Sequence, residues 1–271
     1  MTDASGGRHA RDVDLAAIEA VQPREGTGLT QRFCRPVSKH LTRFFLARGV
    51  PAAAVSAMNI AVGVAAAACL ACPRLGVALL FIPLTYVAEV LDCSDGEVAR
   101  ASGTSDATFF FADVAAHYFI IPLVVLALGI RAAAQQQASW PLALGAVGAI
   151  FCTPTITLYR VRASIVLEEL LARAAREPVR VHPLLSSRTG RLAGDFGFER
   201  PTHRWRIPLG TGLSVIVSVG LLVELVTGLR VLQAVSIATA VAFPLARAAD
   251  YALAIRHGKP ADELRRILGA P

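Results

Sequence analysis

Hydrophobic residues in this chain are concentrated in six long runs that are separated by more polar stretches. Each run is close to the roughly 20 residues that an α-helix needs to cross the hydrocarbon core of a bilayer. The runs cover residues 52–72, 75–94, 107–130, 140–159, 208–228 and 231–254. The pattern predicts an all-α integral membrane protein with six transmembrane helices.

The residues before the first run have a different pattern. Residues 35–50 mix basic and apolar residues at helical spacing, which predicts an amphipathic helix lying in the membrane interface. An ordinary solvated start of a helix is the alternative. Residues 1–34 have no apolar core of signal-peptide length, so we expect a mobile cytosolic tail, with a short helix near Asp14–Val21.

Positive charges gather on one side of the predicted spans. Six helices place both termini on the same side, and of the 27 Lys and Arg residues only Arg74, Arg131 and Arg230 fall on the other. The positive-inside rule therefore predicts a multi-pass protein of the cell membrane with both termini in the cytoplasm. The six-helix domain is expected over residues 51–258, with a cytosolic loop at 160–206 and a cytosolic tail at 259–271.

The composition agrees with a membrane location. Hydrophobic residues make up 54% of the chain and the mean hydropathy is +0.53, which excludes an ordinary soluble domain. The net charge of +7 is explained by the one-sided placement of the cations, so the expected partner is the lipid bilayer and not a nucleic acid. Cys69 and Cys72 form a single C-x-x-C, which is either a redox or metal pair or small apolar filler.

One polar segment, residues 92–117, interrupts the apolar pattern with acidic residues at helical spacing. Asp92 and Asp95 are three apart, and Asp113 and His117 are four apart, so each pair shares a helix face. Carboxylates at the ends of membrane helices are costly to bury and usually mark a function. If the two helices are antiparallel neighbours joined by residues 101–106, the four groups converge on one pocket.

Oxygen ligands that converge beside Arg100 indicate a site for a divalent metal ion and a phosphate. Glu89 lies one turn deeper than Asp92 on the same face. It either reaches this pocket or is a buried acid hydrogen-bonded to a neighbouring helix. Glu224 and Asp250, in the last two runs, have no partner that the sequence identifies.

The same segment resembles the signature of the CDP-alcohol phosphatidyltransferases. That signature reads D-x-x-D-G-x-x-A-R, eight residues, G, three residues, D, three residues, D. The residues in register are Asp92, Asp95, Gly96, Ala99, Arg100 and Asp113. Two positions depart from it: Phe109 stands at the second glycine and His117 at the last aspartate.

The resemblance implies an enzyme of phospholipid biosynthesis. It would transfer a phosphatidyl group from a CDP-linked lipid donor, such as CDP-diacylglycerol, to a small alcohol acceptor and release CMP. The family is commonly homodimeric, so a homodimer is expected. The implied metal ligands for Mg²⁺ or Mn²⁺ are Asp92, Asp95, Asp113 and His117. CDP would be bound by Asp92, Gly96, Ala99 and Arg100, with Asp113 and His117 catalytic. Apart from the resemblance, Arg160 and Arg162 lie at the inner end of the fourth run, where they either bind an anionic acceptor or anchor the helix by the positive-inside rule.

The two departures shape the expected chemistry. A neutral imidazole at His117 can ligate a metal and accept a proton, but it is a softer ligand, which shifts the expected preference from Mg²⁺ toward Mn²⁺. Phe109 either narrows the nucleotide pocket or points to lipid. They also motivate an alternative, a catalytically degenerate family member that acts as a membrane binding or scaffold protein. A small transporter with intramembrane acids is a third hypothesis.

Overall fold

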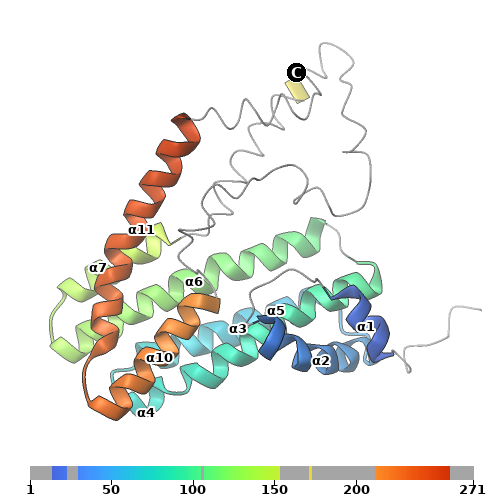
Figure 1. The fold of residues 1–271 in the computed structure, drawn as a ribbon, viewed down its shortest axis with the longest axis horizontal. Coiled ribbons are helices and arrows are strands. Elements are labelled where there is room, and N and C mark those ends of the chain that lie inside the picture. The colour runs from blue at the N-terminus through green and yellow to red at the C-terminus, as the bar shows by residue number, and fades with distance from the viewer. Residues whose placement is uncertain (1–13, 23–29, 105–106, 153–170, 173–210, 257–271) are drawn as a thin grey trace, which may run out of the picture. The chain divides into compact units, whose positions relative to one another are not determined.

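Helices account for every regular element in the part of the chain that the structure describes, as the sequence predicts (Figure 1). This computed structural model describes residues 14–22, 30–104, 107–152, 171–172 and 211–256. The elements are α1 (Leu15–Val21), a π-helical turn η1 (Thr30–Cys34), α2 (Arg35–Ala47), α3 (Ala52–Ala71), α4 (Leu75–Ala78), α5 (Phe81–Ser102), α6 (Ala107–Gln136), α7 (Trp140–Phe151), α10 (Thr211–Thr227) and α11 (Val231–Arg256).

Four helical segments are long and apolar enough to cross a membrane, which indicates a membrane protein. They are Ala52–Ala71, Leu75–Ser102, Ala116–Gln136 and Val231–Ala249. The described parts of α7 and α10 are apolar but shorter. Residues 153–159 and 208–210, which the sequence assigns to these two runs, lie outside the described residues. The six predicted spans and the cytoplasmic orientation therefore stay predictions.

The chain divides into two units. The first comprises residues 1–152 and 208–241, and the second comprises residues 153–207 and 242–271. In the second unit the structure describes residues 171–172 and the C-terminal part of α11. The predicted tail at 259–271, and the loop at 160–206 apart from residues 171–172, lie outside the described residues. All the site residues described below belong to the first unit.

α5 carries the first half of the polar segment and is packed against several other helices. Pro83 lies in its first turn, where a missing backbone N–H breaks no helical hydrogen bond. The helix ends at Gly103, whose left-handed backbone (φ +70°) suits glycine and lets its N–H bond the last carbonyls. α3 and α2 pack along α5, and α3 also packs against α6.

The N-terminal region differs from the expected mobile tail. α1 forms where the short helix was predicted, and its Ile18 is fully buried. α1 and α2 both lie against α5 (Figure 1). The expectation of a mobile segment therefore needs correction for residues 14–22 and 30–34, while the rest of the predicted tail lies outside the described residues.

α2 confirms a helix within residues 35–50 but presents an unexpected face to the protein. Its buried residues are Ser38, Thr42 and Phe45, whereas Val37 and Phe44 are exposed. Two of the three buried side chains are polar, so α2 is attached to α5 by polar contacts as well as by apolar packing. Its location in the membrane interface stays a prediction.

α6 and α7 approach each other closely at two glycines. A Cβ atom added to Gly129 would lie 2.6 Å from the Cα of Gly145 and 2.9 Å from the carbonyl oxygen of Pro141. Both of these are backbone atoms, which cannot move aside as the end of a side chain can. Small residues at such crossings let helix backbones approach closely in membranes.

We expect Gly129→Ala to lower the free energy of unfolding by about 1–3 kcal/mol, the usual cost of overpacking. Thermal unfolding of the detergent-purified protein measures this. The matched control is Gly76→Ala, because a Cβ atom at that helical position meets nothing within 4 Å among the described residues. Equal stability of the two variants would contradict the close crossing.

Arg131 and Glu224 form a buried ion pair that connects four helices. Arg131 of α6 is 2% exposed, and its Nη2 lies 3.1 Å from Oε2 of Glu224 in α10. Arg131 also donates a hydrogen bond to the carbonyl of Cys72 at the end of α3. The other carboxylate oxygen of Glu224 accepts from the backbone N–H of Leu232 in α11, at 3.0 Å. The sequence analysis placed Arg131 among the few cations on the side away from the rest and found no partner for Glu224, so both residues gain a structural role here.

Glu224→Gln is expected to destabilise the protein by about 3–5 kcal/mol, because it leaves the Arg131 charge buried without a counter-charge. The change in unfolding free energy in detergent is the measurement. Arg230→Gln is the control, since among the described residues Arg230 bonds the backbone carbonyl of Gln135 alone, in an exposed contact. A Glu224→Gln protein as stable as the Arg230→Gln protein would rule out this ion pair as a major stabilising contact.

Candidate functional site

Asp92 of α5 and His117 of α6 face each other, as the polar segment predicts. The Nε2 atom of His117 lies 3.7 Å from Oδ1 of Asp92, and the two side chains are 38% and 30% exposed. The same Asp92 oxygen accepts a hydrogen bond from Nδ2 of Asn59 in α3, at 3.3 Å. Asp92 is thus held between two helices while part of its carboxylate stays accessible.

Asp95 lies one turn further along α5 and also faces α3. Its Oδ2 accepts a hydrogen bond of 2.6 Å from Oγ of Ser56, and the residue is only 1% exposed. Asp92 and Asp95 therefore share a helix face, as their spacing predicts. Their accessibility differs, however, and in this arrangement Asp95 is closed off from solvent.

Gly96 and Arg100 follow Asp95 along α5 and lie close together. A Cβ atom added to the buried Gly96 would lie 3.1 Å from Nη1 of Arg100, so the guanidinium group folds back over the glycine. The Nε of Arg100 donates to the carbonyl oxygen of Val21 at the end of α1, at 2.8 Å. The absence of a side chain at position 96 thus makes room for this arginine.

Ala99 and Phe109 are part of the apolar core. Ala99 is completely buried, and Phe109, at 7% exposure, belongs to the same cluster as Phe45, Val55 and Leu91. Phe109 therefore does not point to lipid, one of the two orientations expected for it. The CDP-binding role of Ala99 stays a prediction that this packing does not favour, because the residue presents no accessible surface.

Three predicted site residues cannot be placed. Asp113 lies in α6, one helical turn before His117, but its side chain is outside the described residues. Arg160 and Arg162 lie entirely outside the described residues. Their roles as catalytic, metal-binding or acceptor-binding groups stay predictions.

A cavity of about 140 Å³ opens beside Asp92 and His117. Asn59 and Glu89 add polar groups to its lining, and Ile120, Val124 and Leu213 make the rest mainly apolar. Glu89 therefore does reach the pocket, one of the two possibilities that its spacing left open. Helices α3, α5, α6 and α10 all contribute to this cavity, so it is an internal feature of the first unit.

A larger apolar cavity of about 300 Å³ adjoins the first. The two share Thr85, Glu89 and Ser214 in their linings. Most of the larger cavity is formed by apolar side chains of α5 and α10, and Phe33 of η1 also lines it. A polar pocket and a space suited to hydrocarbon are thus neighbours within the protein.

The residues beside the polar cavity have the donor chemistry for Mg²⁺ or Mn²⁺. These ions prefer carboxylate oxygens, and Asp92 presents a partly accessible carboxylate that Asn59 orients, with Glu89 lining the same space. Among the described side chains, no three His, Cys, Asp or Glu residues are close enough together to form a complete metal site. The side chain of Asp113 is outside the described residues and is not part of that search. Asp92 and Glu89 therefore fit as part of a metal coordination shell.

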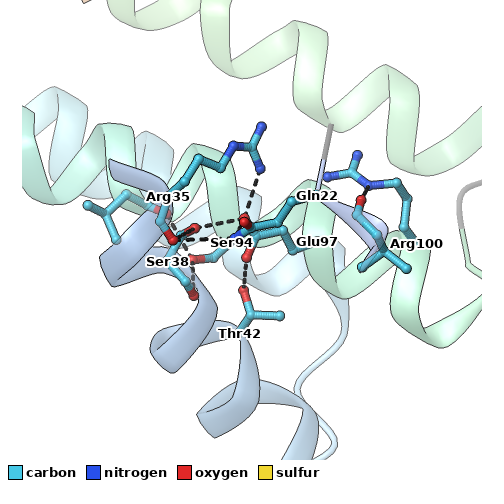
Figure 2. A network of polar contacts seen from close by, with 9 residues as sticks. Gln22, Arg35, Ser38, Thr42, Ser94, Glu97 and Arg100 are labelled. Carbon is cyan, nitrogen blue, oxygen red and sulfur yellow. Dashed lines mark hydrogen bonds and ion pairs between the residues drawn. The ribbon is translucent and has the colours of Figure 1, made fainter. Parts of the chain in front are cut away.

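Glu97, inside the motif, is the site residue that the sequence analysis missed. Its carboxylate is fully buried and accepts four hydrogen bonds from the N-terminal region (Figure 2). The donors are Gln22 (2.9 Å), Arg35 (2.8 Å), Ser38 (2.7 Å) and Thr42 (2.7 Å). These bonds attach the end of α1 and one face of α2 directly to the motif helix. The signal available in the sequence was the polar pair Ser38 and Thr42, four apart on α2, facing no predicted partner.

A second contact between the N-terminal region and α5 involves two thiols. Cys34 and Cys93 are both buried and both reduced, and they pack with Val90. The Cys93 thiol donates a hydrogen bond to Cys34, which lowers the pKa of the Cys34 thiol below its usual range. The C-x-x-C pair, Cys69 and Cys72, is also unbridged.

Comparison with known proteins adds no family assignment. The chain matches no protein-family model, and no curated protein sequence matches it significantly.

Glu97→Gln is expected to lower the unfolding free energy by about 3–5 kcal/mol, because Arg35 loses its buried counter-charge and the new amide N–H₂ faces hydrogen-bond donors. Thermal unfolding measures the loss of stability, and proteolysis of the N-terminal region measures undocking. Glu19→Gln is the control, since Glu19 pairs with Lys39 on the surface. Intact protease resistance and unchanged stability in Glu97→Gln would contradict the role assigned to this carboxylate.

Proposed function

We propose that this protein is a membrane transferase that moves a phosphatidyl group from a CDP-linked lipid to an alcohol and releases CMP. The observation that carries the proposal is the pairing of Asp92 with His117 at 3.7 Å beside a cavity. This pair lies in the segment that resembles the CDP-alcohol phosphatidyltransferase signature. The sequence pattern and the geometry therefore both favour Asp92 and His117 as site residues.

The adjoining apolar cavity supports a lipid-linked donor. A hydrocarbon chain there would be shielded from water by α5 and α10, while the polar end of the molecule would reach the space beside Asp92. The four apolar helices are consistent with such a substrate, because a lipid donor enters from the bilayer. The proposed location is the cell membrane with the site on the cytoplasmic side.

In the proposed reaction, the acceptor hydroxyl attacks the phosphorus that carries the lipid alcohol. A new oxygen–phosphorus bond forms, the bond to CMP breaks, and the hydroxyl proton must be taken up. His117 is placed for this step, since a neutral imidazole accepts a proton near physiological pH. The carboxylate of Asp92 then stabilises the imidazolium charge across the 3.7 Å gap.

A divalent cation would supply neutralisation of the diphosphate charge when bound. Asp92 would hold it, with Asp113 contributing by its place in the motif. Arg100 binds phosphate oxygens as a planar fork at the end of α5. Gly96 leaves the space that this guanidinium occupies. Asn59 and Ser56 keep the two α5 carboxylates in fixed orientations.

The ion pair of Glu224 with Arg131 argues against the transporter hypothesis. This acid is bound to Arg131 and to the backbone of α11, so it acts as a structural contact. The alternative with a specific observation in its favour is a non-catalytic binding protein. Phe109 fills the core at the family's glycine position, which would be compatible with a pocket that no longer admits a nucleotide.

The deciding measurement is thermal stability of the detergent-purified protein with Mg²⁺ or Mn²⁺, with and without CDP. A ligand present at 100 times its Kd stabilises the folded state by about 2.7 kcal/mol, which shifts the melting temperature by several degrees. We expect wild type to gain this shift with metal and CDP together, more with Mn²⁺ than with Mg²⁺. Asp92→Asn should lose it, and Glu19→Gln should keep it.

Release of CMP from CDP-diacylglycerol in the presence of alcohol acceptors then tests catalysis. His117→Asn is expected to slow release by about 100-fold or more, the usual contribution of a general base. CDP binding that survives in His117→Asn would separate the chemical step from nucleotide binding. If wild type gains no stability at high CDP and metal concentrations, the transferase proposal fails and the non-catalytic binding protein replaces it.

A further inference from the structure

Arg35, the first residue of α2, has more hydrogen-bonding capacity than its contacts use. Its Nη1 bonds Glu97 at 2.8 Å, and its side chain is only 12% exposed. Its Nε is buried and has no hydrogen-bond partner within the described residues. A buried guanidinium N–H without a partner costs free energy, so a ligand that accepts from Arg35 would be stabilised there.

The position of Arg35 is close to the residues already assigned to the donor. Glu97, its partner, lies between Asp95 and Arg100 on α5. Figure 2 shows the guanidinium groups of Arg35 and Arg100 on the same side of Glu97. Arg35 therefore lies along the motif helix, between its metal-binding and phosphate-binding ends.

Two guanidinium groups lie along this stretch of α5. Arg35 pairs with Glu97, and Arg100 lies over Gly96. Each guanidinium carries five N–H donors in a plane that matches phosphate oxygens. One guanidinium group binds one phosphoryl group, and a diphosphate has two phosphoryl groups. Two arginines therefore match a diphosphate.

We propose that Arg35 is a second phosphate-binding residue, which together with Arg100 holds the diphosphate of the CDP-linked donor. The inference rests on the proposed function and deepens it by assigning a recognition role to the N-terminal region. Glu97 then has two tasks: it docks α2 on α5, and it orients the Arg35 guanidinium. The ligand class that this pair selects is a nucleoside diphosphate in preference to a monophosphate.

The test compares binding of CDP and CMP, with metal present, to the detergent-purified full chain. Arg35→Lys keeps the charge and a donor for Glu97 but loses the planar fork. We expect it to weaken CDP binding by about tenfold, which corresponds to one charge-assisted hydrogen bond, and to weaken CMP binding by much less. Lys39→Gln, which changes a cation on the same helix that pairs with Glu19, should alter neither affinity more than about twofold.

Ser38→Ala separates recognition from docking. Ser38 donates to the same Glu97 oxygen as Arg35, so its loss weakens the network while the arginine remains. Ser38→Ala should keep the preference of wild type for CDP over CMP. An equal loss of that preference in Ser38→Ala and Arg35→Lys would overturn the inference, because Arg35 would then act only through docking.

The outcomes for wild type separate this inference from the proposed function. If wild type binds CDP and Arg35→Lys binds it equally well, the transferase proposal stands and the role of Arg35 is wrong. If wild type binds neither CDP nor CMP, both proposals fall. A selective loss of CDP affinity in Arg35→Lys, with Lys39→Gln and Ser38→Ala like wild type, supports both.

Discussion

A carboxylate without access to water must find its hydrogen bonds within the protein, and Glu97 imposes this requirement on the motif helix. Its burial leaves two oxygens that need donors, and the four donors come from α2 and from the end of α1. Leaving such a charge unpaired costs several kcal/mol. The N-terminal region is therefore fixed on α5 by the needs of one side chain, and the residues that surround Arg100 follow from that docking. Val21, which accepts from Arg100, is brought there by the neighbouring bond of Gln22.

The polar side chains of α5 lie on two faces, and each face contacts different helices. Asp92 and Asp95 face α3, where Asn59 and Ser56 orient them, and Asp92 also faces His117 of α6. Glu97 faces α2. α5 therefore connects the polar cavity with the docked N-terminal region. A shift of the contacts on either face would move the backbone of this one helix. The buried pair of Arg131 and Glu224 follows the same rule elsewhere in the first unit, because a buried charge there also joins several helices through its hydrogen bonds.

The sequence predicted the helical class, the break between two helices at residues 101–106 and the meeting of Asp92 with His117, because these depend on hydrophobic period and on spacing along one helix. It did not predict partners that come from distant parts of the chain. Glu97 looked like an ordinary variable position of the motif, since nothing in its neighbourhood shows that Ser38 and Thr42 will face it. Phe109 was ambiguous for a related reason: a large apolar residue near a helix start suits lipid, ligand and core equally well, and only the packing of α2 and α3 around Ala99 selects the core. Glu224 and Arg131 are likewise far apart in the chain, so their pairing has no local signal.

The Glu97 network also sets an order of events during biosynthesis. Gln22 and Thr42 precede their carboxylate partner by 75 and 55 residues, so they emerge from the ribosome well before it. α1 and α2 cannot complete their docking until α3 and α5 have been made. This N-terminal region thus reaches its final position only after later elements of the chain have formed. Until then, its serine, threonine and arginine side chains remain hydrated, and Ile18 and Phe45, which are buried in the docked region, stay exposed.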